Sequence, residues 1–281
     1  MSGLSLLVNI ATMSMTAQIT ALYHYPIKSF AGIAVERLAF DSAGPVDDRR
    51  WMLVNAKGRF VSQRDMPELA NFGVQSQGDG YRITAPDGDY RNLIRGVAST
   101  APITVTVWKD DLDGWEVSSE LSAWFSDKLG KAVRLVYLGT ESERRVPDAA
   151  ALDHERVGFA DGYPLLLCNQ SSLEGLNERA GVELDVRRFR PNLVVSGLPM
   201  DQELELGRLT LADGHLQLLK PCERCSIPAV DPDTGVYQRA VATALKEHSR
   251  FNGKTIFGMN AVARGVSELR VGDSAQLASA D

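Results

Sequence analysis

Two cysteines separated by two residues are the most distinctive chemical feature of the sequence. Cys222 and Cys225 lie within Lys220-Pro-Cys-Glu-Arg-Cys225, on a loop that we expect to leave a strand. A thiolate can bind a soft metal or act as a nucleophile, and cations such as Lys220 and Arg224 stabilise it and attract anionic ligands. The pair therefore predicts metal or thiol chemistry in a cationic site, or two inert loop cysteines.

The surrounding sequence disfavours two other uses of this pair. A structural zinc ion takes four ligands, and only Cys168 and His215 could complete the set. A thioredoxin-like pair places its first cysteine at the start of a helix, whereas Pro228 and its neighbours oppose a helix here. A reactive or metal-binding thiolate and a pair without chemistry both stay open.

Three arginines and an asparagine precede an expected buried strand in the stretch Arg187-Arg-Phe-Arg-Pro-Asn192. Arg190 and Asn192 alternate around a proline at the mouth of that strand. A guanidinium and an amide placed there could hold a phosphate or a heterocycle through paired hydrogen bonds. Arg187 and Arg188 are expected on a solvated face.

Two segments near the beginning of the chain could add further polar groups to an anion site. Tyr25-Pro-Ile-Lys-Ser29 ends an expected strand with an ammonium and a hydroxyl, and Asp47-Asp-Arg-Arg-Trp51 follows. Each is weak when taken alone. The first is consistent with an ordinary turn, and the second with a surface ion pair between Asp48 and Arg49 or Arg50.

Composition limits the classes of function that this chain can have. With 281 residues and 44% hydrophobic residues, it can form two modest domains with substantial cores. Thirty basic and 36 acidic residues give a formal charge of −6, which argues against binding a nucleic-acid polymer along a basic face. Three cysteines fit a reducing compartment, so we expect a cytoplasmic protein. Residues 1–15 have no signal-peptide or membrane-spanning pattern, and we expect them to be disordered.

The first half of the chain shows the alternating apolar pattern of antiparallel strands. Between about residues 16 and 136, short apolar runs are separated by Gly, Pro, Asp and Asn. We expect strands over Ile19–Tyr25, Trp51–Asn55, Tyr81–Ala85 and Ile103–Trp108, turns at Lys57-Gly58 and Asp87-Gly88, and a helix over Ser119–Leu129 ended by Gly130. This half, assigned to residues 16–137, predicts a barrel or a sandwich.

The second half, assigned to residues 138–278, combines strands with two helices. The polar stretch Gly139–Glu155 should connect the halves or form a long loop over the site. An apolar run over Tyr163–Cys168 precedes Ser171 and Glu174, which have capping-box spacing before a helix that ends near Gly181. We further expect strands over Leu193–Ser196, Leu209–Ala212 and Leu216–Leu219, a turn at Asp213-Gly214, a helix over Arg239–His248, and one or two closing strands within Val262–Leu277. The predicted fold class is mainly β (α+β).

Taken together, these segments resemble the MOSC family, in the branch with an N-terminal MOSC β-barrel that includes the bacterial YcbX proteins and the mitochondrial amidoxime-reducing component. The matching segments are Tyr25–Ser29, Asp47–Trp51, Phe159–Pro164, Phe189–Gly197, Lys220–Cys225, Asp231–Gly235, Phe257–Asn260 and Val271–Asp273. They follow the order of the family over nearly the whole chain. The resemblance implies an N-terminal β-barrel-like domain, then a MOSC β-barrel domain with a few short helices.

The resemblance also implies a molybdenum–pterin cofactor and the residues that bind it. Cys225 is the implied molybdenum ligand and catalytic residue, and a soft thiolate is a suitable ligand type for such a metal. Cys222 has no certain role. The residues implied to hold or line the cofactor are Lys28, Ser29, Arg49, Asp161, Gly162, Tyr163, Arg190, Asn192, Arg224 and Asn260.

The implied function is a molybdenum-cofactor-dependent oxidoreductase that reduces small N-hydroxylated compounds. The chain stops at Asp281 without an appended ferredoxin-like domain, and Cys168 alone remains beside the cysteine pair, too few for a two-iron cluster. We therefore expect no iron–sulfur cluster of its own and an external electron donor, a flavoprotein, ferredoxin or cytochrome. The alternative is a carrier of the molybdenum cofactor or of persulfide sulfur. No membrane or nucleic-acid partner is expected.

Overall fold

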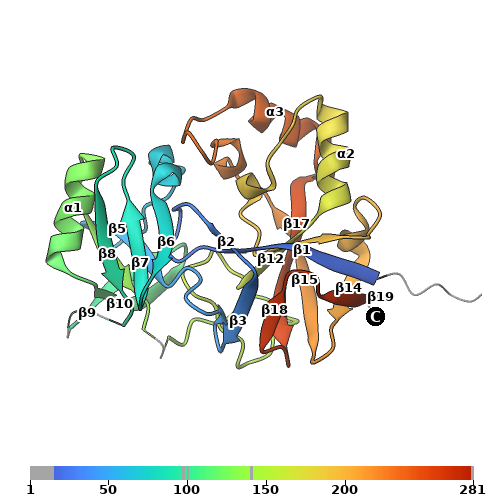
Figure 1. Ribbon diagram of the computed structural model, residues 1–281, viewed down its shortest axis with the longest axis horizontal. Coiled ribbons are helices and arrows are strands. Elements are labelled where there is room, and N and C mark those ends of the chain that lie inside the picture. Colours follow the sequence, from blue (N-terminus) through green and yellow to red (C-terminus); the bar gives the residue numbers. More distant parts are fainter. Residues whose placement is uncertain (1–15, 97–98, 100, 140–141, 280–281) are drawn as a thin grey trace, which may run out of the picture.

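The computed structural model describes residues 16–96, 99, 101–139 and 142–279. Figure 1 shows two groups of strands side by side, one built mainly from the first half of the chain and one mainly from the second. The prediction of a mainly β fold with a few short helices is confirmed. The predicted disorder of residues 1–15 falls outside the described residues.

A closed barrel forms the larger of the two groups. Its strands, in order around the ring, are β12 (Leu165–Asn169), β13 (Leu193–Ser196), β1 (Thr16–His24), β19 (Ser274–Ser279), β14 (Leu206–Thr210), β15 (His215–Glu223) and β17 (Lys254–Arg264), and β17 pairs with β12 to close it. Only β12 and β13 among these neighbours run parallel, because helix α2 (Gln170–Ala180) connects them as a crossover. Outside the ring, β2 (Ile33–Val35) pairs with β1 and β16 (Arg250–Phe251) pairs with β17.

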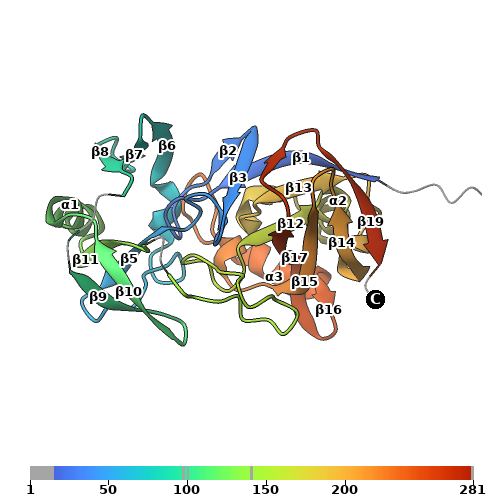
Figure 2. The same cartoon turned by 90° about the horizontal axis from the view of Figure 1, so that it is seen from below.

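The first strand of the chain belongs to this barrel. Buried Ala17, Ile19 and Leu22 lie along β1, which is hydrogen-bonded between β13 and β19. In the same way β3 (Arg37–Asp41) pairs with both β4 (Gly44–Pro45) and β18 (Glu268–Arg270). The predicted domain boundary after residue 137 therefore separates the two halves of the sequence. It does not separate the sheets, because strands from both sides of it pair with each other. Figure 2 shows β1, β2 and β3 extending toward the barrel strands.

Two smaller sheets and one helix make up the other group. One sheet has the order β5 (Trp51–Asn55), β11 (Val133–Tyr137), β10 (Asp110–Glu116), β9 (Pro102–Val107), and the other is β6 (Gly73–Gln77), β7 (Gly80–Thr84), β8 (Tyr90–Ile94). Helix α1 (Ser119–Leu129) has the predicted bounds, because Ser118 caps its first turn and Gly130 ends it with φ 59°. The rings of Phe30, Phe72 and Phe125 pack together in the core between these elements.

The two helices of the second half differ in how well the local sequence predicted their ends. Helix α3 (Arg239–His248) has the predicted bounds, and Gly181 ends α2 as expected. The predicted capping box was wrong, because Asn169 caps α2 through its side chain and Ser171 is already helical. Asn169 is the last residue of β12, so strand and helix follow without a loop. No helix within the described ranges has the length and apolar character needed to cross a membrane.

Gly258 in β17 provides a test of the barrel closure. It has φ 79°, and an added Cβ would lie 2.5 Å from the carbonyl oxygen of Leu167 in β12. Gly181 has φ 63° with open space around it, so Gly181→Ala should cost only the strain of the left-handed conformation, about 1 kcal/mol. Gly258→Ala should cost roughly 1–3 kcal/mol more in urea unfolding, because β12 and β17 must separate. Equal costs for the two substitutions would contradict a tight contact of β12 with β17 at this position.

Candidate functional site

A cavity of about 370 Å³ lies where the two groups of strands meet. Its wall combines the turn after β1, the segments before β5 and β12, and strands β15 and β17. All the residues predicted from the sequence line this one cavity: Lys28, Ser29, Arg49, Asp161, Gly162, Tyr163, Arg190, Asn192, Arg224, Cys225 and Asn260. The fold thus brings together every predicted site residue, and their individual roles stay predictions.

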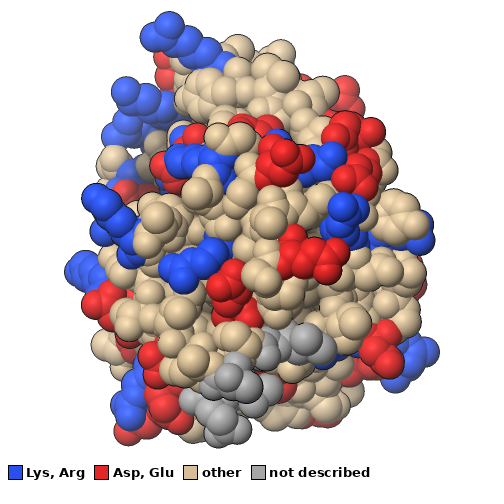
Figure 3. All heavy atoms as spheres, turned by 90° about the vertical axis from the view of Figure 1, so that its left-hand side faces the viewer, with Lys and Arg blue, Asp and Glu red and all other residues tan. Residues whose placement is uncertain are grey.

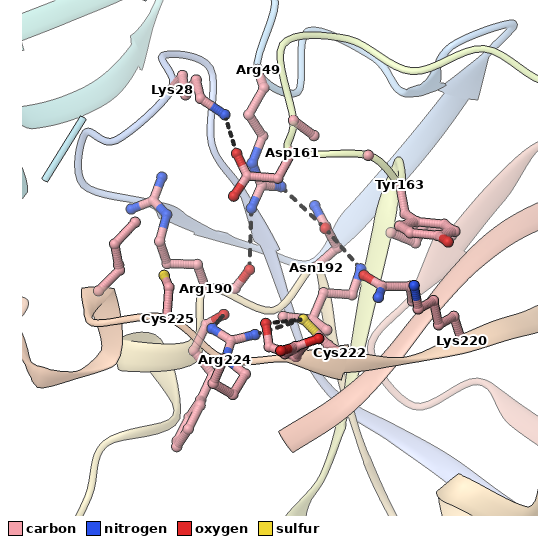
Figure 4. A pocket seen from close by; sticks show the side chains of 18 of the residues that line it. Lys28, Arg49, Asp161, Tyr163, Arg190, Asn192, Lys220, Cys222, Arg224 and Cys225 are labelled. Atoms are coloured by element: carbon pink, nitrogen blue, oxygen red, sulfur yellow. Dashed lines mark hydrogen bonds and ion pairs between the residues drawn. The ribbon is translucent and has the colours of Figure 1, made fainter. Parts of the chain in front are cut away.

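The three cysteines are free and differ in their exposure to solvent. Cys225 is exposed at the cavity, and Arg64 Nη2 lies 3.5 Å from its sulfur. Cys222 is half-buried and accepts a hydrogen bond from Arg224 Nη1 at 3.0 Å. Cys168 is buried, and its burial raises the pKa of the thiol. Figure 4 shows the side chains of Cys222 and Cys225 well apart, so Cys225 is the exposed thiol beside a cation.

Two arginines of the cavity wall are held over the ring of Tyr25. The guanidinium carbons of Arg49 and Arg190 lie 4.2 and 4.3 Å from the centre of this ring. Arg49 also donates to the Asp48 carboxylate and to the carbonyl oxygen of Arg190, and Arg190 donates to the carbonyl oxygen of Phe30 at 2.6 Å. Burial, together with the charge of Arg49, lowers the pKa of Arg190 to about 10. Cation–π contact and fixed acceptors therefore keep two like charges close together.

Lys28 forms a second charged wall of the cavity. Its buried ammonium donates to the carbonyl oxygen of Phe159 at 2.7 Å and to Asp161 Oδ1 at 2.5 Å. Burial lowers the pKa of Lys28, and Asp161 opposes this effect. Desolvation alone would raise the pKa of Asp161, but the charges of Lys28 and Arg64 outweigh it and hold that pKa well below its usual range. The pair therefore remains ionised, with Arg64 Nη2 3.3 Å from Asp161 Oδ2.

Asn192 links the strands of the site through its side chain. Its amide nitrogen donates to Asp48 Oδ1 at 3.2 Å and to the carbonyl oxygen of Tyr23 at 3.4 Å. Its amide oxygen accepts hydrogen bonds from the backbone of Leu166 and from Arg49. The amide thus makes all its hydrogen bonds within the protein, and it orients Arg49. Asn192 has no spare donor for the predicted direct hydrogen bond to a ligand.

Two guanidinium groups of the wall retain donors without acceptors. Arg190 Nη2 and Arg224 Nε are buried, and neither has a hydrogen-bond partner among the described residues. Such donors cost free energy unless an acceptor is supplied. An anionic group in the cavity would supply it, and Cys225 offers a soft ligand on the same wall. The donor set therefore fits an anionic cofactor that carries a soft metal.

Several expectations about charged residues need correction. Arg188 was predicted on a solvated face, but it is buried. It donates to Asp231 and Gln238, and these hydrogen bonds connect Val186–Phe189 to the loop after Ile227–Ala229. Arg187 is half-exposed and pairs with Asp233, as a surface residue does. The possible surface pair of Asp48 and Arg49 is instead part of the buried network beneath the cavity.

The structural zinc site finds no support in the fold. Within the described ranges, no group of three His, Cys, Asp or Glu side chains is arranged to hold a metal ion. Cys168 is enclosed in an apolar cluster with Leu176 and Phe189, and His215 lies at the opposite end of β15 from Cys222. The two residues that could have completed the set therefore do not complete it.

Arg64 is the main residue of the site that sequence reasoning missed. It contacts both Cys225 and Asp161, yet it follows Ser62-Gln63 in a short loop without any distinctive spacing. With Arg64 and Lys220, six basic side chains line the cavity, against the carboxylates of Asp161 and Glu223. Figure 3 shows acidic and basic side chains interspersed on one end of the molecule. The excess of positive charge at the cavity is therefore local in a chain with net charge −6.

The predicted loop Gly139–Glu155 contributes to the site mainly through its first half, although residues 140 and 141 lie outside the described ranges. Pro147 lines the cavity. Arg144 is buried and donates to the carbonyl oxygens of Gly158 and Ala160, both at 2.6 Å, and to that of Asp161 at 3.2 Å. Arg144 therefore fixes the backbone that presents Asp161 to Lys28.

The chain matches two family descriptions and is similar to several known proteins. The family description "MOSC N-terminal beta barrel domain" matches residues 16–132, and "MOSC domain" matches residues 154–276. The chain is 29% identical to mitochondrial amidoxime reducing component 2 of Rattus norvegicus, over 91% of this chain and 81% of that protein. It is 26% identical to mitochondrial amidoxime-reducing component 1 of Homo sapiens, over 92% and 82% of the two chains. It is also 27% identical to a molybdenum cofactor sulfurase of Drosophila grimshawi, over 86% of this chain but 31% of that protein.

The ion pair of Lys28 and Asp161 predicts a specific change in titration. Because the folded-state pKa of Asp161 is below its ordinary value of about 3.9, this carboxylate stabilises the fold above that pH, and the contribution is lost as the pH falls. Lys28→Met should raise the pKa of Asp161 by about one unit or more, measured by carboxyl carbon NMR. Lys128→Met, which removes the partner of Asp87 and Asp89, should leave Asp161 unchanged. An unchanged pKa of Asp161 in Lys28→Met would refute the assignment.

Proposed function

The chain belongs to the MOSC family, since an N-terminal MOSC β-barrel domain is followed by a MOSC domain, and we propose that it is a molybdenum-cofactor-dependent oxidoreductase. In this proposal it reduces small N-hydroxylated compounds with electrons from a separate donor protein. The relatives named as amidoxime-reducing components support this class of reaction.

The observation that carries the proposal is the composition of one cavity. An exposed thiol, Cys225, shares it with six basic side chains, and two of these retain buried donors without partners. Because no cluster of three metal-binding side chains exists within the described ranges, a metal here needs an organic group that supplies most of its ligands. A pterin with a phosphate and two sulfurs meets both requirements, since it is anionic and brings its own soft ligands.

Each part of the wall has a different task in this proposal. Arg190 and Arg224 bind the phosphate and the polar edge of the pterin, and Arg49 reinforces the positive field from its position over Tyr25. Cys225 binds the metal, and Arg64 stabilises the charged sulfur. Lys28 holds Asp161, which lines the same wall. These residues would thus hold and orient the cofactor, which would supply the redox chemistry.

The cofactor, when bound, supplies the two-electron chemistry that removes oxygen from nitrogen. The overall reaction consumes an N-hydroxylated compound, two electrons and two protons, and it yields the reduced nitrogen compound and water. The three cysteines of the chain are fewer than the four that a plant-type two-iron cluster takes, so in this proposal the electrons come from a separate protein. A flavoprotein, ferredoxin or cytochrome is the proposed donor, and a cytoplasmic location stays a prediction.

A carrier of the cofactor or of sulfur is the second candidate function. Two observations favour it: the similarity to a molybdenum cofactor sulfurase, and the half-buried Cys222 beside Arg224. In that case Cys225 or Cys222 would hold a persulfide received from a separate sulfur donor, and no electron donor would be required. The two functions therefore differ in whether bound cofactor turns over a substrate.

Metal content and turnover of two cysteine variants test the proposal. Protein made in a host that synthesises the cofactor should contain near-stoichiometric molybdenum and releasable pterin, and it should reduce benzamidoxime when reduced methyl viologen supplies electrons. Cys225→Ser should fold, as judged by circular dichroism, but lose reduction, whereas Cys222→Ser should keep it. Retained reduction in metal-replete Cys225→Ser would refute the ligand assignment. Bound cofactor without reduction in the native protein would support the carrier.

Pterin occupancy tests the arginine assignment by a matched pair of substitutions. Arg190→Gln removes a cation whose buried Nη2 has no partner among the described residues, whereas Arg187→Gln removes a cation already paired with Asp185 and Asp233. Arg190→Gln should lower the pterin released per protein, and Arg187→Gln should not, because only the first residue lines the cavity. Full occupancy in Arg190→Gln would show that this residue does not bind the cofactor.

A further inference from the structure

A second cavity of about 270 Å³ adjoins the first, and none of the residues predicted from the sequence to hold the cofactor lines it. The two cavities share Ser62 and Arg64, so Arg64 stands between them and reaches the sulfur of Cys225. The remaining lining residues are Asn55, Arg59, Phe60, Val61, Asp65, Trp108 and Lys131. All of these come from the first half of the chain. A molecule bound in this second cavity therefore lies next to the Cys225 side of the site.

Trp108 forms one wall of the second cavity from a strained position. It is at the tip of the hairpin between β9 and β10, where Val107 pairs with Asp110 across a two-residue turn. Such turns favour Asn or Gly at positive φ, yet Trp108 has φ 58° and is 46% exposed. A bulky residue at positive φ is an outlier, and strain of this kind gathers at functional positions. The turn thus holds a large aromatic ring at the cavity at an energetic cost.

Phe60 and Arg64 surround the ring of Trp108. The ring of Phe60 lies 5.3 Å from that of Trp108 and is tilted by 60° to it, and the Arg64 guanidinium covers one face of the indole at 4.7 Å. Lys28 Nζ lies 5.2 Å from the centre of the Phe60 ring, so this wall borders the first cavity directly. A planar ring can stack on the other face of the indole and meet the tilted ring of Phe60 edge to face.

Two unpaired cations lie on the same cavity. Arg59 and Lys131 are exposed, and among the described residues neither side chain has an ion-pair or hydrogen-bond partner. Asp65, the only carboxylate in the lining, is engaged with Ser62. The second cavity therefore combines an aromatic wall with uncompensated positive charge, which suits a ring that carries an acidic substituent.

We propose that this second cavity is the substrate subsite, and that it selects planar aromatic N-hydroxylated compounds with an acidic substituent. The ring stacks on the indole face of Trp108 that Arg64 leaves free, with Phe60 at its edge, and the acidic group binds Arg59 and Lys131. The N-hydroxyl end then points past Arg64 toward the Cys225 side. This inference rests on the proposed function for the reaction itself, but the binding that it predicts requires only the second cavity.

Direct binding tests the subsite in the purified protein. Isothermal titration calorimetry gives Kd for 4-carboxybenzamidoxime, for uncharged benzamidoxime and for the non-aromatic amidoxime of cyclohexanecarboxylic acid. The native protein should bind the carboxylated ring most tightly and the non-aromatic compound least. Trp108→Gly should weaken binding of the carboxylated ring about tenfold, and Trp108→Phe should largely preserve it. Trp108→Gly should keep a thermal midpoint near the native one, because relief of the strain at positive φ offsets the lost contacts with Phe60 and Arg64.

The cationic part of the subsite has its own variants. Arg59→Gln combined with Lys131→Gln should weaken binding of 4-carboxybenzamidoxime about fivefold and leave benzamidoxime unchanged. High salt should reduce the advantage of the carboxylated ligand in the native protein. The control Arg37→Gln removes an exposed arginine of β3, away from the lining, and should change neither Kd.

The outcomes separate this inference from the proposed function. Unaltered binding in Trp108→Gly, or no preference of the native protein for the carboxylated ring, would overturn the subsite even in a protein that contains molybdenum and reduces benzamidoxime. Binding that depends on Trp108 and Arg59, in a protein that contains no molybdenum when made in a host that synthesises the cofactor, would support the subsite and overturn the redox function. In the cofactor-loaded enzyme, the Arg59 and Lys131 double variant should lower the kcat/KM ratio of carboxylated to uncharged substrate about fivefold.

Discussion

The buried carboxylate of Asp48 is the interaction on which the rest of the site depends. It accepts hydrogen bonds from the backbone of Tyr25, from the amide of Asn192 and from the guanidinium of Arg49. Tyr25 follows β1 and Asn192 precedes β13, both in the barrel, whereas Arg49 precedes β5 in the other group of strands. One carboxylate therefore joins both groups. A buried charge is tolerated only when its partners are complete. The network therefore holds the two groups of strands in the one arrangement that forms the cavity.

Several cations can lie close together above this network because each one has its own acceptor or aromatic ring, which offsets their mutual repulsion. Asp48 neutralises Arg49, the Tyr25 ring lies beneath Arg49 and Arg190, and Asp161 pairs with Lys28. Arg224 is held by Cys222 and by the carbonyl oxygen of Phe189. Such an arrangement is pre-organised for an anion, since the side chains need little reordering when it binds. Folding brings these cations together against their mutual repulsion, and an anionic ligand relieves that repulsion when it binds.

Backbone strain is concentrated in the same region. Ser29, Arg49 and Arg190 have φ 73°, 49° and 57°, and Trp108 adds a fourth such position beside the second cavity. Each of these conformations is unfavourable for a residue with a side chain. They aim a hydroxyl, two guanidinium groups and an indole from turns at the ends of strands. The fold thus uses turns, rather than strand interiors, to aim the side chains that line both cavities.

The sequence alone was sufficient where structure depends on neighbours along the chain. The bounds of Ser119–Leu129 follow from its caps, and those of Arg239–His248 follow from helical spacing; both signals act within one or two turns. The segments that resemble the family identified the predicted lining residues, because those segments are local in sequence. Tertiary structure decided the remainder: β1 joins the far barrel, Arg188 is buried, Asn192 is fully used within the protein, and Arg64 reaches Cys225. These outcomes depend on which distant groups meet, and neither spacing nor residue type encodes that meeting in any short stretch of chain.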